Sequence, residues 1–496
     1  MTTSLLSPGS IARLREALVV SGYTRHGVSE RLGSEAVAVC GGVSAADALR
    51  HSTEPDRLTT LIRLFLCGRV EPAEAVAAAL APLDLAAAIQ AGLVERLGTG
   101  VRAAVDLHPY GDWWVVADVR PDLRPERATP ADHVMCAGPV SVELAGAVLR
   151  RPVATALDLG IGNGVQSLHL SRHAARVTGV DLSGRALRFA ATTAALNGLG
   201  WELIEGDLVT PVADRRFDLV VCNPPFVVGP GRTTLLYQDS GRPGDGLTAE
   251  LAVQGSSVLA DGGYLQYVAG WMHVTGEDWR DRVSGWVPGG LDAWILQRSL
   301  ADPASYVDSW LAQTHGATAA DRDAWLRWFA ELRVEAIGTG LVTLRRSGRD
   351  DPVVRIESLF HEFDPPLGTQ VEAWFARQDW LRDHEPLDGR YVPGDGLTLW
   401  QAAEHTGPDG WRLDRQMLSL QAGLRWSEDA DPLVVNVVGA CANGKPLRDE
   451  LVQFAVANDA APEAVVEAAA PHIPHLVERG FLLPVDIAQE VSPGTG

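Results

Sequence analysis

The stretch FDLVVCNPPFVVGPG, residues 217–231, runs an apolar, strand-like segment directly into Asn223-Pro224-Pro225-Phe226. The side-chain oxygen of Asn223 and the main-chain oxygen of Pro224 can accept both N–H bonds of a planar NH2 group. This turns the nitrogen lone pair towards an electrophile without a strong base, and the prolines hold the acceptors still. Phe226 offers a face on which a flat group can stack. We predict that these four residues are catalytic and act on an amide or aromatic amine; the alternative is a rigid turn.

A glycine-rich turn upstream has the spacing of a cofactor-binding loop. It lies between a strand-like and a helix-like segment, so backbone amides at the helix start can approach a ligand without Cβ atoms in the way. A dinucleotide-binding turn would need a small residue where Val165 stands, which disfavours a nicotinamide cofactor. The predicted cofactor contacts in this turn are Asp158, Gly160, Gly162, Asn163 and Gly164.

Acidic residues end the next two predicted strands. Asp181 is placed to accept the hydroxyls of a ribose, and Leu182 follows it to line an adenine face. Gly206-Asp207 ends the third strand, where the carboxylate would lie near an adenine amine. We add Asn223, at the end of the fourth strand, to the predicted cofactor contacts.

These residues resemble those of two nested protein families. Asp158 to Gly164, Asp181 and Gly206-Asp207 resemble the D-x-G-x-G-x-G turn, the strand-two acid and the strand-three Gly-Asp of class I S-adenosylmethionine-dependent methyltransferases. Asn223 to Phe226 resemble the Asn-Pro-Pro-Phe/Tyr N-methyltransferase branch of small-domain methyltransferases, which includes release-factor glutamine, ribosomal RNA guanine-N2 and adenine-N6 enzymes. The resemblance covers about 215 residues. It implies S-adenosyl-L-methionine as the cofactor and a Rossmann-like seven-stranded sheet whose last strand is antiparallel.

The same resemblance leaves the acceptor open. Phe at position 226 is frequent among guanine enzymes, whereas glutamine and adenine enzymes commonly have Tyr there. The Arg-Pro-x-Thr-Glu of the glutamine enzymes is replaced by CAGPVSVEL, residues 136–144. We expect an S-adenosylmethionine-dependent N-methyltransferase acting on a macromolecule, either a protein glutamine in a translation factor or a base amine in ribosomal or transfer RNA. The alternatives are a small-molecule N-methyltransferase and an inactive cofactor-binding protein.

The chain is predicted to fold as three α/β parts. Residues 1–130 show short helical patterns and two strand-like runs, 101–110 and 112–120, which suggest a winged-helix-like module. Residues 131–350 alternate strands with helices, as in a parallel sheet covered on both faces. Residues 351–496 are expected to form an acidic α+β part. We predict a second winged-helix-like module there, because Leu-Val-Glu-Arg at 93–96 recurs at 476–479 and is expected to end a helix in both places. The strands expected in the central part are 153–159, 175–181, 201–205, 217–222, 264–269, 292–299 and 340–346.

Two further segments of the central part carry expectations. Trp325, Trp328 and Phe329 fall on one face of a helical insertion and are expected to be core residues. The loop 227–246 is long and rich in Gly and Pro, so we expect it to close over the substrate, with Tyr237 or Arg242 touching it. The alternative is an ordinary long surface loop.

Composition sets the remaining expectations. The net charge of −21 disfavours nucleic acid, although the winged-helix-like ends and Phe226 favour it. The chain has no apolar run of about 18 residues and no export signal near Met1, so we expect a cytoplasmic protein without a membrane partner. The five cysteines contain no C-x-x-C pair and the histidines no H-E-x-x-H spacing, so no metal is predicted. The oligomeric state is left open. The cysteines are Cys40, Cys67, Cys136, Cys222 and Cys441.

Overall fold

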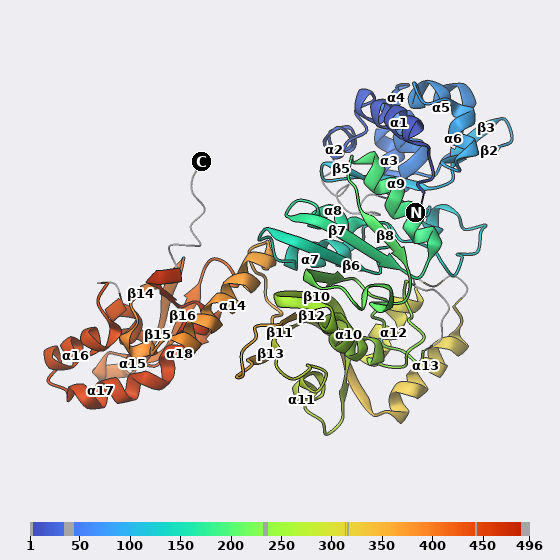
Figure 1. Cartoon of the computed structure of the whole chain (residues 1–496). Coiled ribbons are helices and arrows are strands. Elements are labelled where there is room, and N and C mark those ends of the chain that lie inside the picture. The colour runs from blue at the N-terminus through green and yellow to red at the C-terminus, as the bar shows by residue number, and fades with distance from the viewer. Residues whose placement is uncertain are drawn as a thin grey trace. The chain divides into compact units, whose positions relative to one another are not determined.

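A computed structural model describes residues 3–33, 44–231, 237–312, 314, 317–441 and 444–487 (Figure 1). Cys40 lies outside these residues. The chain divides into two compact units. The first unit comprises residues 1–145 and 151–360, and the second comprises residues 146–150 and 361–496. The domain boundaries expected at residues 130 and 350 stay predictions.

A mixed sheet of eight strands forms the centre of the first unit, in the order β13-β11-β12-β10-β9-β6-β7-β8. Strand β12 runs antiparallel to both of its neighbours, and the other pairs are parallel. The expected α/β sheet is therefore present, and β12, the last of the seven expected strands, is antiparallel as expected. The strands are β6 (Val153–Leu159), β7 (Ala174–Asp181), β8 (Glu202–Glu205), β9 (Phe217–Cys222), β10 (Leu259–Val274), β11 (Asp292–Ala301), β12 (Val334–Arg345) and β13 (Val354–Ser358).

Strand β13 is an addition to the seven expected strands. It pairs in parallel with β11, from Ala293↔Val354 to Gln297↔Ser358, and so extends the sheet at one edge. Its side chains are mostly half-buried, which explains why no apolar run marks it in the sequence. The expectation of a seven-stranded sheet is corrected to eight strands.

Helices cover both faces of this sheet because its central strands are apolar on both sides. On one face Leu157, Leu159 and Val220 pack against Leu247 and Leu251 of α10. On the other face Ile161 packs against α9. The helices are α7 (Pro139–Ala147), α8 (Val165–Leu170), α9 (Gly184–Leu196), α10 (Gly246–Ser257), α11 (Trp279–Ser284) and, in the insertion between β11 and β12, α12 (Pro303–Leu311) and α13 (Ala319–Glu331). A 3-10 turn, Thr210–Val212, follows β8.

The N-terminal region of the first unit is mainly helical and shares a core with α9. Leu14 and Leu18 of α1 belong to the same buried cluster as Phe189 and Leu196. The helical segments are α1 (Pro8–Val20), α2 (Arg25–Leu32), α3 (Ala45–His51), α4 (Arg57–Leu61), the π-helix Ile62–Leu66, α5 (Ala73–Leu80), α6 (Leu85–Gln90) and the 3-10 turn Pro121–Leu123. The strands are β1 (Glu71–Pro72), β2 (Val94–Leu97), β3 (Gly100–Ala103), β4 (Asp106–Tyr110) and β5 (Trp113–Ala117).

Two expectations for this region are wrong. The run 101–110 is not one strand, because β3 pairs with β1 and β2, whereas β4 pairs with β5 in a separate sheet. Residues 93–96 do not end a helix, since Val94 begins strand β2, whereas residues 476–479 end a helix in the second unit. The repeated Leu-Val-Glu-Arg therefore adopts two different structures.

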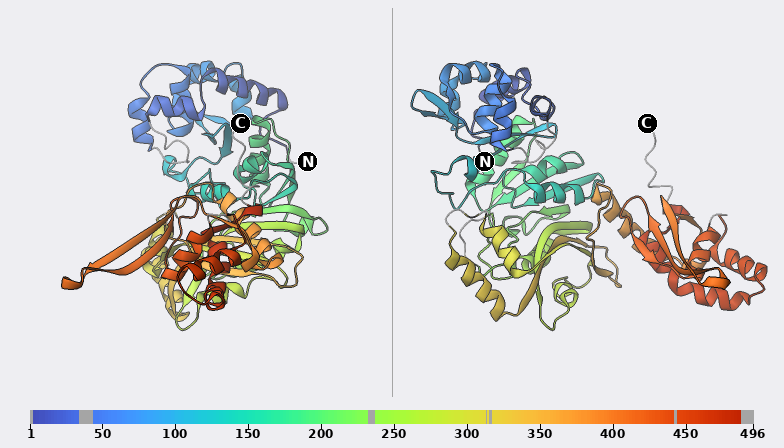
Figure 2. Two further views of the ribbon diagram at one scale, coloured as in Figure 1. Left: turned by 90° about the vertical axis from the view of Figure 1, so that its left-hand side faces the viewer. Right: turned by 180° about the vertical axis from the view of Figure 1, so that it is seen from behind.

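The second unit contains the long helix α14 and a sheet in the order β15-β16-β17. Strands β15 and β16 form a hairpin that extends away from the helices of this unit (Figure 2). The helices are α14 (Leu367–Asp383), α15 (Pro432–Ala440), α16 (Leu447–Ala457), α17 (Pro462–Ala469) and α18 (Ile473–Arg479), with 3-10 turns at Pro386–Asp388, Gly407–Asp409 and Ala470–His472. The strands are β14 (Tyr391–Pro393), β15 (Leu397–His405), β16 (Trp411–Leu420), β17 (Ser427–Asp429) and β18 (Leu482–Pro484), which pairs with β14.

Within the described part of the chain, no helix combines the length and apolar character that crossing a membrane requires.

Candidate active site

Four parallel strands bring the predicted site residues to one edge of the sheet. Leu159 of β6 pairs with Cys222 of β9, and Asp181 of β7 pairs with Glu205 of β8. Because neighbouring parallel strands point the same way, the segments that follow their carboxyl ends lie side by side. The glycine-rich turn, Asp181, Gly206-Asp207 and the Asn-Pro-Pro-Phe segment all follow these ends.

The glycine-rich turn needs its glycines for conformation. Gly160, Gly162 and Gly164 have φ of 68°, 55° and 85°, in the left-handed region that side chains disfavour. A Cβ atom on Gly164 would also lie 2.4 Å from the ring of Trp201. At these three glycine positions the turn therefore has backbone that no Cβ atom covers, immediately before α8.

Asp158 is a buried carboxyl group below this turn, with 1% of its surface exposed. Its Oδ2 accepts a hydrogen bond of 2.7 Å from the Ser167 hydroxyl. Burial raises the pKa of Asp158 to about 7, because removal from water disfavours the charged form, although the Ser167 bond opposes that shift.

Asp181 ties the turn to the end of β7. Its Oδ2 accepts from the Gly162 amide at 2.9 Å and its Oδ1 from the Ser183 amide at 2.8 Å. Burial raises the pKa of Asp181, and these two bonds oppose the shift. Each carboxylate oxygen retains a lone pair for a hydroxyl. Leu182 beside it is 58% exposed and so offers an apolar surface at the strand end.

Gly206 and Asp207 follow β8 beside Asp181. The Gly206 amide donates to the Asp181 carbonyl at 3.0 Å. Asp207 is exposed and lies 3.8 Å from the guanidinium of Arg242, which also binds Glu250. The loop after Asn-Pro-Pro-Phe therefore reaches the predicted adenine end of the site.

Asn163 uses both ends of its amide within the protein. Its Nδ2 donates to the Met135 carbonyl at 2.6 Å, and its Oδ1 accepts from the Val165 amide at 2.9 Å. The structure thus shows Asn163 fastening the segment before α7 to the turn, and its contact with a cofactor stays a prediction.

Asn223 presents an acceptor that no group in the described residues uses. Its Nδ2 donates to the Ser141 hydroxyl at 3.1 Å, whereas its Oδ1 is buried without a hydrogen-bond partner. A buried unpaired oxygen is costly, so its retention indicates a ligand that would bind there. Sequence reasoning did not identify Ser141, although it lies in the quoted stretch CAGPVSVEL.

The helical insertion forms a wall beside Phe226. The Phe226 ring meets Trp310 edge to face, with centroids 5.8 Å apart, and the Val228 amide donates to the Tyr306 hydroxyl at 2.8 Å. Trp325 packs so closely that a Cβ atom on Gly229 would lie 2.9 Å from its ring. Phe329 is a core residue as expected, with 1% exposed, whereas Trp325 and Trp328 are half-buried and pack against the cluster that contains Phe329. Tyr306 and Trp310 were not singled out from the sequence.

The loop 227–246 is tied back onto the site, and its residues 232–236 lie outside the described residues. Two antiparallel bridges, Phe226↔Asp239 and Gly229↔Gly244, fold it on itself. Asp245, which is buried, forms an ion pair with the half-buried Arg282. The Tyr237 ring lies 5.8 Å from that of His133, in the segment before α7. Closure over a substrate, and contact of Tyr237 or Arg242 with it, stay predictions.

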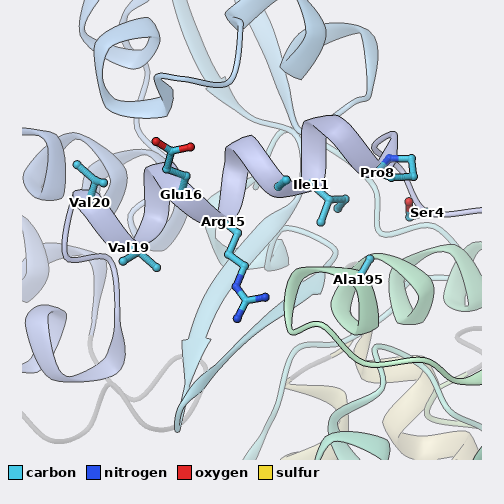
Figure 3. A pocket seen from close by; sticks show the side chains of 9 residues that line it. Ser4, Pro8, Ile11, Arg15, Glu16, Val19, Val20 and Ala195 are labelled. Carbon is cyan, nitrogen blue, oxygen red and sulfur yellow. The ribbon is translucent and has the colours of Figure 1, made fainter.

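Two other features contain none of the predicted site residues. A groove of about 620 Å³ between α1 and α9 (Figure 3) contains none of the predicted site residues. Among the described residues, Asp106, His108 and Cys136 are buried with ligand-capable atoms within 4.8 Å of one another. Each of the three already interacts with a neighbouring group, and the expected absence of a metal stays a prediction.

Comparison with known families identifies the central segment. Residues 143–272 match the model of the methyltransferase small domain. Residues 20–104 and 372–484 match two domains of unknown function, DUF7059 and DUF7782.

Characterised relatives match the same region over short lengths. The ribosomal RNA small subunit methyltransferase C of Alcanivorax borkumensis is 37% identical over 23% of this chain and 31% of its own. The release factor glutamine methyltransferase of Geobacter sulfurreducens is 40% identical over 16% of this chain and 30% of its own. The chain spans about a third of the length of the curated relatives it matches first.

A solved structure matches at lower similarity. The S-adenosylmethionine-dependent methyltransferase from Thiobacillus denitrificans, in complex with S-adenosyl-L-homocysteine, is 22% identical over 41% of this chain and 90% of its own, with a TM-score of 0.24.

Proposed function

Because residues 143–272 are a methyltransferase small domain, we propose that this chain transfers the methyl group of S-adenosyl-L-methionine to a planar NH2 group. The observation that carries this proposal is the buried Oδ1 of Asn223, which has no hydrogen-bond partner among the described residues and stands one residue beyond the end of β9. An oxygen in that position accepts an N–H bond, and it selects an amine or amide over a carboxylate.

The residues around the turn fit this cofactor. Three left-handed glycines leave the backbone uncovered at their own positions in the turn, and Asp181 keeps lone pairs for ribose hydroxyls. When bound, the cofactor supplies an electrophilic methyl group on a sulfonium sulfur. The proposed cofactor contacts are Asp158, Gly160, Gly162, Asn163, Gly164, Asp181, Leu182, Gly206, Asp207 and Asn223.

The proposed catalysis rests on positioning of the acceptor nitrogen. Asn223 Oδ1 and the Pro224 carbonyl accept its two N–H bonds, so the lone pair turns out of the π system. Pro224 and Pro225 restrict the backbone, and the Phe226 face stacks against the flat acceptor group. The wall formed by Trp310 limits the room beside that ring.

The acceptor belongs to a macromolecule in this proposal. The net charge of −21 favours a protein, with a glutamine amide as the target, over a polyanion. The named relatives are a release factor methyltransferase and a ribosomal RNA methyltransferase, which supports the proposal of a cytoplasmic reaction.

A second version takes an RNA base as the acceptor, and a feature of the N-terminal region favours it. The small sheet has the order β1-β3-β2, with α5 and α6 between β1 and β2. This arrangement supports a winged-helix-like module, a fold that often binds nucleic acid but also docks proteins. A winged-helix-like module in residues 351–496 belongs to the same proposal.

The test is methyl transfer from radiolabelled S-adenosylmethionine into extract of a strain that lacks this gene. Parallel samples are digested with protease or ribonuclease, and the Asn223→Ala variant serves as the inactive control. Loss of label to protease identifies a protein acceptor, and loss to ribonuclease identifies an RNA acceptor. Absence of label in the macromolecular fraction would contradict the proposal.

A further inference from the structure

Ser141 stands at a junction between the cofactor turn and the acceptor site. Its side chain is buried, with 9% of the residue exposed, near the start of α7. The Ser141 hydroxyl accepts from Asn223 Nδ2 at 3.1 Å, and its carbonyl accepts from Gln166 Nε2 at 2.8 Å. Gln166 is the second residue of α8, which follows the glycine-rich turn. Ser141 thus accepts one hydrogen bond from a side-chain amide on the acceptor side of the site and one from a side-chain amide on the side of the glycine-rich turn.

The amide of Asn223 has two ends of similar size and opposite hydrogen-bonding character. Its nitrogen donates and its oxygen accepts, so the group can serve a substrate NH2 only if the oxygen is the end that faces it. The bond to Ser141 engages the nitrogen and leaves the oxygen without a partner. Without that bond, the Asn223 amide could rotate and turn its nitrogen, which is a donor, towards the substrate NH2 group, which is also a donor.

We propose that Ser141 is a positioning residue for methyl transfer, which orients the Asn223 amide so that Oδ1 accepts from the substrate nitrogen. Ser141 itself does not touch the reacting atoms. This inference rests on the proposed function, because it assigns the residue a part in the same site. It also explains why the buried Ser141 hydroxyl forms a hydrogen bond with a side chain 82 residues away rather than with a carbonyl of its own helix.

The experiment compares Ser141→Thr with Ser141→Val in the full-length protein. These two side chains have nearly the same shape, and only threonine keeps the hydroxyl. The measurements are the maximal rate of label transfer from S-adenosylmethionine into the gene-deficient extract, the KM for the cofactor, and the midpoint of thermal unfolding. Ser256→Ala is a matched control, since that buried hydroxyl bonds only the Val253 carbonyl of its own helix.

We expect Ser141→Thr to keep most of the rate and Ser141→Val to lower the maximal rate about tenfold, the size of one positioned hydrogen bond. The KM for the cofactor should stay unchanged in both variants. In an Asn223→Ala background, Ser141→Val should cause no further loss, because the two residues act as one unit.

Equal rates for the threonine and valine variants would overturn the inference while leaving the proposed function intact. A further loss in the Asn223→Ala background would overturn it too, since Ser141 would then act independently of Asn223. Wild-type protein that transfers no label to the extract would instead overturn the proposed function and, with it, the role of Ser141.

Discussion

At the residue scale, Asp181 and Asn223 lie at the carboxyl ends of two strands of the same sheet, β7 and β9, and we expect them to have separate roles. Asp181 holds the turn through Gly162, whereas Asn223 keeps an acceptor for the substrate. We expect Asp181→Ala to weaken binding of S-adenosylhomocysteine in calorimetry. Asn223→Ala should leave that binding nearly unchanged and lower the rate of methyl transfer by a factor on the order of 100. Equal effects of both substitutions on cofactor affinity would contradict the assignment.

Asp158 gives a second residue-scale prediction, which concerns pH. Its pKa of about 7 in the folded protein lies above the ordinary value of 3.8 for an aspartic acid, so the folded state binds its proton more tightly than the unfolded state. The protonated carboxyl therefore contributes stability that is fully present below about pH 4 and is lost as pH rises through 7. We expect the cofactor-free wild type to lose stability relative to Asp158→Asn over this interval, measured by urea unfolding. A difference independent of pH would show that Asp158 is ionised throughout.

At the element scale, the helical insertion supports the strand end that carries the acceptor site. The Tyr306 hydroxyl accepts from the Val228 amide, which is buried two residues beyond Phe226. Tyr306→Phe leaves that amide unpaired, so we expect a loss of about 1–3 kcal/mol in the free energy of unfolding and slower methyl transfer.

A matched substitution separates these two effects. Tyr391 in the second unit also loses one hydrogen bond, to the Pro386 carbonyl, when it is replaced by phenylalanine. Tyr391→Phe should lower stability by a similar amount without slowing methyl transfer. If both variants slow transfer equally, the insertion has no special role at the site.

At the scale of the whole molecule, the two compact units are expected to unfold separately. All of the proposed cofactor contacts lie in the first unit. A ligand that binds only a folded state stabilises it, by about 2.7 kcal/mol at 100 times its Kd. S-adenosylhomocysteine should therefore raise the midpoint temperature of one calorimetric unfolding transition and leave that of the other unchanged.

Two variants assign these transitions. Trp374 is buried in the second unit, with 2% exposed. Trp374→Ala should therefore lower the midpoint temperature of only the transition that does not respond to the ligand. Asp181→Ala should reduce the ligand-induced shift of the other transition. A single transition that moves as a whole would mean that the two units unfold together.

Local sequence patterns correctly predicted most of the central sheet and the glycine-rich turn after its first strand, whereas the cofactor contacts of that turn stay a prediction. β6 and β9 match their expected bounds, 153–159 and 217–222, because buried parallel strands are continuous apolar runs bounded by turn residues. The glycines after the strand ends are also local signals, because they mark positions where the backbone has positive φ. The acidic residues there are local signals too, because they mark positions where we predict contacts with the cofactor. The edge strand β13 has no such run, and the strands of the N-terminal region could not be divided correctly without their partners.

The contacts at the proposed acceptor site depend on tertiary packing and could not be predicted from local sequence patterns. Ser141 lies 82 residues from Asn223, and Tyr306 lies 78 residues from Val228. Neither contact has a local signature, because the choice of a distant partner depends on how the helices pack against the sheet. The hydroxyl of Ser141, in the stretch CAGPVSVEL, could be linked to the site only because the fold places it against the amide of Asn223.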